Sequence, residues 1–127
     1  MVSRLRLLAL VAGATTGAAC HSQEEARVED ACETFTFLAL SCQGLSTPDC
    51  EPCNPACVER WRDAEKIDAA CGTLYLDYWE CVAGLACGEL DAWSQGVSMG
   101  SSDGPCGERE IEFRARCGSL RLLGSDP

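Results

Sequence analysis

The sequence predicts an all-α fold, a small disulfide-crosslinked bundle of three to four short helices. Apolar residues and cysteines recur three and four positions apart, which is the spacing of a helix with one buried face. No long alternation with a period of two, the pattern of a half-buried strand, is present. The 127 residues also include eleven cysteines, and so many cysteines in a small exported chain indicate a disulfide framework.

The first 19 residues have the order of an export signal. Arg4 and Arg6 make a basic start, residues 5–11 are almost all apolar, and residues 12–19 are small or hydroxylated. The apolar run is too short to cross a bilayer as a permanent helix. We therefore expect residues 1–19 to be a signal peptide.

The signal ends in a motif at residues 16–20, Thr-Gly-Ala-Ala-Cys. This motif resembles the lipobox of bacterial lipoproteins, although Gly17 stands where Leu or Val is usual. The resemblance implies a diacylglycerol on Cys20 and cleavage just before it. Ordinary signal-peptidase cleavage is the alternative, because Gly17 and Ala19 are small enough for that enzyme too.

Cysteine parity favours lipidation. An odd thiol is a liability in an exported protein, and assigning Cys20 to the lipid leaves an even number. The expected disulfide cysteines are Cys32, Cys42, Cys50, Cys53, Cys57, Cys71, Cys81, Cys87, Cys106 and Cys117. We expect an exported protein, lipid-anchored in the bacterial cell envelope, in the outer membrane and facing the periplasm or the cell surface.

The charge balance of the chain restricts the classes of partner that it is expected to bind. Without residues 1–19, eight basic residues face twenty acidic ones. So acidic a surface repels phosphate backbones, which argues against nucleic-acid binding. The acids occur in ones and twos, a pattern typical of a solvated surface, and a cationic partner is the alternative.

The elements are expected in the following order. Residues 20–28, polar after Cys20, read as the lipidated residue and a tether to a cysteine-rich domain over 29–118. A first helix is expected over 29–42, with acidic residues at its N-terminus where the helix dipole favours them. Residues 43–53 read as a turn-rich loop.

A second helix is expected from Pro55 to about Ala70, with Asn54 as N-cap and Pro55 at the first helical position. Gly72 reads as its C-terminal stop, and a third helix begins at Thr73. Its apolar stripe consists of Leu74, Tyr78, Cys81 and Leu85.

Residues 94–105 read as a Gly/Ser-rich loop, residues 108–117 as the last helix and residues 119–127 as a tail. Three segments, 32–42, 71–81 and 106–117, carry a cysteine at each end. They fit either a repeat or independent cross-linked helices.

The helical prediction restricts the disulfide pairing. Cysteines ten residues apart on a helix are about 15 Å apart, whereas a disulfide needs Cα atoms within roughly 7 Å. Short links make consecutive helices antiparallel, so the first and third helices run parallel. This arrangement predicts Cys32–Cys71, with Cys42 bonded to Cys81 or Cys57. If residues 55–70 are a loose excursion instead, Cys32–Cys81 and Cys42–Cys71 are expected.

Two cysteine motifs allow an alternative to structural disulfides, either redox catalysis or metal binding. Cys50 and Cys53 form a Cys-x-x-Cys motif like that of thioredoxin-type redox proteins, but no βαβ pattern surrounds it, so structural pairing is the favoured interpretation. Cys50, Cys53 and Cys57 offer three thiolates to a metal, yet oxidation in an export compartment favours disulfides. The single histidine, His21, lies beside the lipid site, and no metal or cofactor is expected.

Enzymatic activity is not expected. Residues 96–100, Gly-Val-Ser-Met-Gly, match the nucleophile-elbow pattern of serine hydrolases. A functional elbow joins a strand to a helix and needs a histidine base, and neither is predicted here.

Aromatic residues are the remaining candidates for binding. Trp61, Tyr75, Tyr78, Trp79 and Trp93 fit a core better than a ligand pocket, because they recur at helical spacing. Tyr75 and Trp79 lie off the main stripe of the third helix, so an exposed pair there is the best candidate for a partner patch.

The complete pattern, a lipobox at Cys20 followed by helical cysteine pairs, resembles the small cysteine-rich lipoproteins of myxobacterial type. The resemblance implies location and form rather than an activity. The leading hypothesis is a non-catalytic interaction or structural module of the cell envelope that has a protein partner. The alternative is a carrier of a small apolar ligand.

Overall fold

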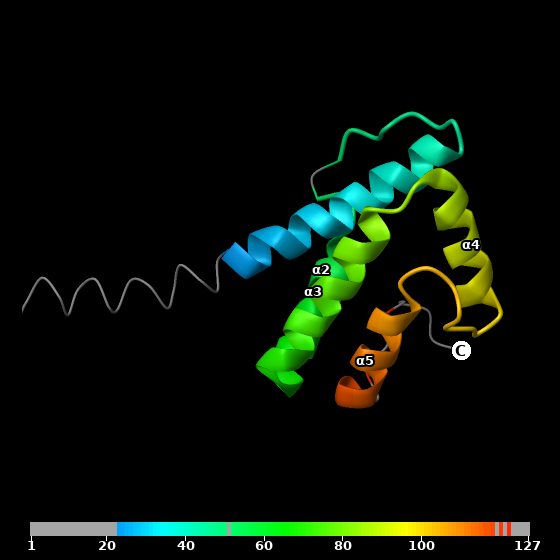
Figure 1. The fold of residues 1–127 in the computed structure, drawn as a ribbon. Helices are drawn as coiled ribbons and strands as arrows, with labels where there is room; N and C mark the ends of the chain where they lie inside the picture. The colour runs from blue at the N-terminus through cyan, green and yellow to red at the C-terminus, as the bar shows by residue number, and fades with distance from the viewer. Residues whose placement is uncertain (1–22, 51, 119, 121, 123–127) are drawn as a thin grey trace, which may run out of the picture.

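The computed structural model describes residues 23–50, 52–118, 120 and 122. Within these residues the chain forms five helices and no strand, so the all-α prediction is confirmed and the predicted count of three to four helices is too low. The expected signal peptide, the lipidation site Cys20 and most of the expected tail lie outside the described residues. The helices cover residues 23–42, followed by α2 (Pro55–Ile67), α3 (Ala69–Ala83), α4 (Cys87–Ser98) and α5 (Gly107–Cys117) (Figure 1).

The N-terminal helix, residues 23–42, begins earlier than the sequence predicts. Residues 23–28 were expected in the tether, but they are helical and dock on the rest of the domain. Val28 is completely buried. Glu25 accepts a hydrogen bond from Arg62 of α2 at 2.7 Å, and Glu24 accepts one from Thr73 of α3. The tether prediction is therefore corrected, because one buried valine and several polar contacts suffice to dock this polar turn.

The start of α2 agrees with the prediction. The side chain of Asn54 accepts a hydrogen bond from the Cys57 amide, and Pro55 occupies the first helical position. The helix ends at Ile67 rather than near Ala70. Asp68, with an extended backbone (φ −166°), closes α2 and caps α3. Gly72, expected to stop a helix, lies inside α3, where it is buried beside the Glu65 side chain of α2.

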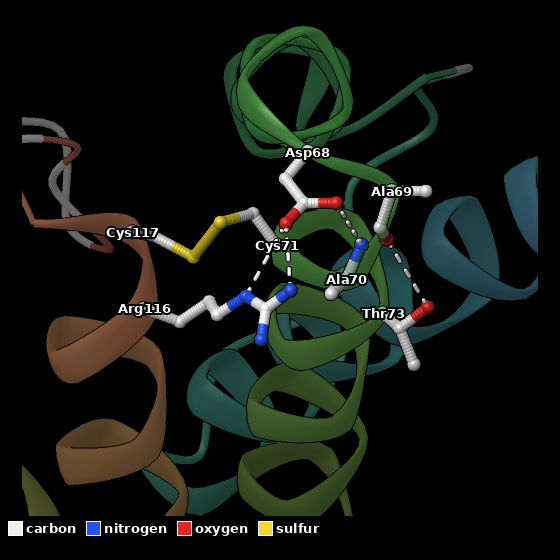
Figure 2. A network of polar contacts seen from close by, with 7 residues as sticks. All are labelled: Asp68, Ala69, Ala70, Cys71, Thr73, Arg116 and Cys117. Atoms are coloured by element: carbon white, nitrogen blue, oxygen red, sulfur yellow. Dashed lines mark hydrogen bonds and ion pairs between the residues drawn. A yellow bond between two sulfur atoms is a disulfide. The ribbon is translucent and has the colours of Figure 1, made fainter.

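Asp68 connects three helices (Figure 2). One carboxylate oxygen accepts a hydrogen bond from the Ala70 amide at the start of α3. The other accepts two from Arg116 in the last turn of α5, at 3.2 and 2.9 Å. The hydrogen bond from Arg116, followed by that from Ala70, lowers the pKa of Asp68 below its ordinary value. The Cys71–Cys117 disulfide lies beside the contact between Asp68 and Arg116 and joins α3 to α5.

Helix α4 was missed, because residues 94–98 were expected in a loop. The helix is anchored by Leu90 and Trp93, which are buried, and its first turn is closed by Glu89, which accepts from the Ala86 amide. Its last turn is rich in Gly and Ser, residues typical of loops. Burial of the apolar side therefore outweighs weak local propensity.

The loop after α4 packs tightly against α5. A Cβ placed on Gly107 would lie 1.8 Å from the carbonyl oxygen of Ser102. Only glycine fits this close backbone approach. The loop is thereby fixed against the start of α5, next to the cysteine that precedes the helix.

The core is centred on α3, which packs against both α2 and α5. The predicted stripe of α3 is partly wrong: Tyr78 is buried as expected, but Leu74, Cys81 and Leu85 are only half-buried. The buried residues of α3 are Cys71, Gly72, Tyr75, Leu76, Tyr78, Trp79 and Val82. Because they surround most of its circumference, α3 is covered on several sides and needs no single apolar stripe.

Candidate functional site

Five disulfides join the ten cysteines of the described residues. They are Cys32–Cys57, Cys42–Cys87, Cys50–Cys53, Cys71–Cys117 and Cys81–Cys106. Four of them connect different elements: three join two helices, and Cys81–Cys106 joins α3 to the residue before α5. Cys50–Cys53 closes a turn within one loop. The disulfide-rich character of the domain is thus confirmed.

Both predicted pairing schemes are wrong. The prediction of parallel first and third helices agrees with the contacts, since Glu24 meets Thr73 and Arg27 meets Glu80. However, Glu24 already lies level with the start of α3. Cys32 follows eight residues later, about 12 Å further along the helix, and so reaches Cys57 instead of Cys71.

The missed helix α4 explains why the predicted partners of Cys42 are wrong. Cys42 bonds Cys87 at the start of α4, a residue that the sequence placed in no helix. Cys71 bonds Cys117 at the end of α5, and Cys81 bonds Cys106, the residue before α5. Helices α3 and α5 are therefore antiparallel and cross-linked at both ends. Two of the three segments with a cysteine at each end, 71–81 and 106–117, pair with each other.

Tyr75 and Trp79 do not form a surface patch. Tyr75 is completely buried and Trp79 is 3 % exposed. The Tyr75 hydroxyl donates to the Cys57 carbonyl at 2.7 Å, and the Trp79 ring packs against Phe35. The expected partner patch is therefore corrected: α3 is covered on this side by the N-terminal helix and α2.

The other aromatic residues also belong to the core. Trp61, Tyr78 and Trp93 are buried, and the Trp93 indole N–H donates to the Tyr78 hydroxyl at 2.9 Å. Burial raises the pKa of Tyr75 and that of Tyr78 to about 12. This agrees with the interpretation of the five residues as core.

A groove of about 310 Å³ lies between the N-terminal helix, the residues before α2 and the first turns of α2. We call it the acidic groove. It is lined by Glu29, Cys32, Glu33, Pro52, Cys53, Asn54, Pro55, Val58, Glu59 and Arg62. Its floor is apolar, since Cys32 and Val58 are buried. No local sequence pattern indicates it, because its lining comes from two helices and a loop.

The charge of the acidic groove is negative. Among the lining residues that the structure describes, Glu29, Glu33 and Glu59 contribute carboxylates and Arg62 contributes the single cation. Arg62 donates to Glu25 at 2.7 Å, which raises the pKa of its guanidinium and occupies part of its positive charge. The groove therefore offers carboxylates above an apolar floor, an arrangement that complements a basic side chain beside an apolar one.

A second groove of about 310 Å³ lies between the N-terminal helix and α4, next to the Cys42–Cys87 disulfide. It is lined by Phe35, Ala39, Cys42, Gln43, Cys87, Leu90, Asp91, Trp93 and Ser94. The rings of Phe35 and Trp93 form a wall, with centroids 5.5 Å apart. Among its described lining residues, Asp91 carries a carboxylate.

The structure also places the residues considered for catalysis and metal binding. Ser98 lies in the last turn of α4 and not between a strand and a helix. No group of three or more metal-ligating side chains occurs within residues 23–50 and 52–118. The sulfur atoms of Cys50, Cys53 and Cys57 are all bonded in disulfides.

Among the described helices, none has the length and apolar content needed to cross a membrane. No protein-family model, curated protein or solved structure matches the chain. The proposals below therefore depend on the residues and their geometry alone.

Proposed function

We propose that the protein is an exported lipoprotein, anchored in the bacterial envelope through Cys20, whose helical domain is a non-catalytic interaction module. The export-type signal and the cysteine parity support the anchor. Five disulfides in so small a domain are typical of an exported protein. The outer membrane remains the proposed location.

The acidic groove is the observation that carries the interaction role. The residues that line it come from elements held together by the Cys32–Cys57 disulfide, so it is preformed. Preformed sites lose less conformational freedom on binding. Its three carboxylates and apolar floor favour a protein segment that carries Lys or Arg next to an apolar residue.

The carrier alternative draws less support from the fold. A carrier needs an enclosed apolar cavity, but the aromatic residues that we considered for its lining pack against one another. The two grooves described above are open surface features. An interaction module explains them better.

The groove proposal predicts charge-dependent binding at this one place. The triple variant Glu29→Gln, Glu33→Gln, Glu59→Gln should bind a labelled peptide of alternating lysine and leucine about tenfold more weakly than the unmodified domain. Three charge contacts of roughly 0.5 kcal/mol each account for this factor. Fluorescence anisotropy at low salt measures the affinity.

The matched control changes the net charge equally but leaves the groove intact. Asp103→Asn, Glu108→Gln, Glu112→Gln removes three exposed acids elsewhere, and this variant should bind like the unmodified domain. A peptide of alternating glutamate and leucine should bind neither the unmodified domain nor this control variant. Equal loss of affinity in the two triple variants would mean that net charge, and not the groove, attracts the peptide.

Lipidation is tested separately. Expressed in a bacterial host, the protein should incorporate labelled fatty acid, and Cys20→Ser should abolish the label and leave the unprocessed precursor. The label is followed by autoradiography, and the N-terminus by mass spectrometry. Normal processing of Cys20→Ser without any label would contradict the anchor and favour plain secretion.

A further inference from the structure

The Cys50–Cys53 disulfide differs from the other four in what it connects. Its cysteines are three residues apart, whereas the other pairs are 25 to 46 residues apart and join different elements. A short closed loop restricts the unfolded chain least. Opening this bond leaves the other four disulfides intact, so the fold depends on it least.

Both cysteines of this bond are also partly exposed. Cys50 and Cys53 are half-buried, whereas Cys32, Cys57, Cys71 and Cys117 are each at most 4 % exposed. Cys87 is exposed, and Cys81 and Cys106 are half-buried, but their bonds hold α4 on the N-terminal helix and α3 on the start of α5. Cys50–Cys53 is therefore the disulfide that combines partial exposure with the smallest structural role.

The surroundings give the two sulfurs different chemistry. Cys53 directly precedes Asn54, the N-cap of α2, and the amides at the start of a helix favour a thiolate. Cys53 also lines the acidic groove, whose carboxylates repel an approaching anionic thiolate. Basic residues beside the incoming thiol would offset this repulsion.

From these observations we propose that Cys50–Cys53 is a thiol–disulfide exchange site that oxidises dithiols of partner proteins whose cysteines are flanked by basic residues. The site acts as a stoichiometric oxidant. This role adds to the contact role proposed above, although the preference for basic flanks rests on the same carboxylates of the groove.

The exchange proceeds in two balanced steps. A partner thiolate attacks Cys50 Sγ, the Cys50–Cys53 bond breaks, and its electron pair leaves on Cys53 Sγ beside α2. The second partner thiolate then attacks the partner sulfur of this mixed disulfide and releases Cys50. Two electrons pass from partner to protein, the partner gains the disulfide, and Cys50 and Cys53 take up the two protons that the partner thiols lost.

The experiment uses the complete mature protein and peptides with two cysteines, flanked by lysines in one and by glutamates in the other. At low salt the lysine peptide should be oxidised faster, on the order of tenfold. Mass spectrometry after alkylation should find new thiols at Cys50 and Cys53 only. A lysine-flanked peptide with one cysteine should be trapped on Cys50.

The double variant Cys50→Ser, Cys53→Ser should keep its helical circular dichroism and lose peptide oxidation. Undiminished oxidation by this variant, or equal reduction of all five disulfides in the unmodified protein, would overturn the exchange site. Equal rates for the two dithiol peptides, with thiols still confined to Cys50 and Cys53, would overturn the preference for basic flanks. That last result keeps the exchange site and counts against the acidic groove, so the two proposals fail separately.

Discussion

Complete reduction of the five disulfides is expected to unfold the helical domain. The loops closed by Cys42–Cys87 and Cys71–Cys117 span 45 and 46 residues, and each bond should stabilise the fold by about 4 kcal/mol. Together the four bonds between different elements then contribute about 15 kcal/mol, the upper end of the typical net stability of about 5–15 kcal/mol. Far-ultraviolet circular dichroism during titration with a phosphine reductant measures the loss of helix.

Single bonds should contribute in graded amounts. Cys71→Ser, Cys117→Ser should cost about 4 kcal/mol, while the short loop of Cys50→Ser, Cys53→Ser should cost only about 1–2 kcal/mol. A chelator should have no effect, and the mass of the oxidised mature chain should be ten hydrogens below that of the reduced chain. Full retention of helix after reduction would contradict the dependence of the fold on its cross-links.

The domain is also expected to unfold between pH 10 and pH 12. Burial raises the pKa of Tyr75 and of Tyr78 to about 12, against an ordinary value of 10. Above pH 10 the unfolded chain therefore binds fewer protons than the folded one, and stability falls as pH rises. Below pH 10 this contribution is fully present. Each tyrosine should cost at most roughly 3 kcal/mol across the interval.

The readout is direct, because Tyr75 and Tyr78 are the two tyrosines of the chain. Tyrosinate absorbance should stay low above pH 10 and then rise together with the loss of helical circular dichroism. The double variant Tyr75→Phe, Tyr78→Phe should remove the steep decline if it folds. In the unmodified protein, tyrosinate formation near pH 10 with intact helices would mean that the two hydroxyls are accessible.

The sequence predicted the elements that have strong local signals. The helical class followed from the spacing of apolar residues, and the start of α2 followed from the cap at Asn54 and the proline after it. Residues 23–28 and helix α4 were missed because tertiary contacts stabilise them. In the first segment Val28 is the buried anchor, and in α4 the anchors are Leu90 and Trp93.

The candidate site was harder to predict from the sequence than the helices were. Pairing of cysteines depends on the register of one helix against another, and a start six residues earlier moved Cys32 level with Cys57. Tyr75 and Trp79 lie off the predicted stripe of α3, yet they are buried because α3 is covered on several sides. The acidic groove arises from segments brought together by folding, so no local pattern indicated it.

The arrangement of the cross-links determines how the chain responds to proteases. A single cut at any peptide bond between Cys32 and Cys117 leaves both fragments joined by at least one disulfide. Most positions are spanned by two or more bonds, but three stretches depend on one bond each: 32–42 on Cys32–Cys57, 57–71 on Cys42–Cys87 and 106–117 on Cys71–Cys117. Of these three, the stretch 57–71 is the one that contains a turn between helices, the α2–α3 turn at Asp68. A molecule nicked at Asp68 is therefore held together by Cys42–Cys87 alone, and reduction of that one bond separates its two fragments.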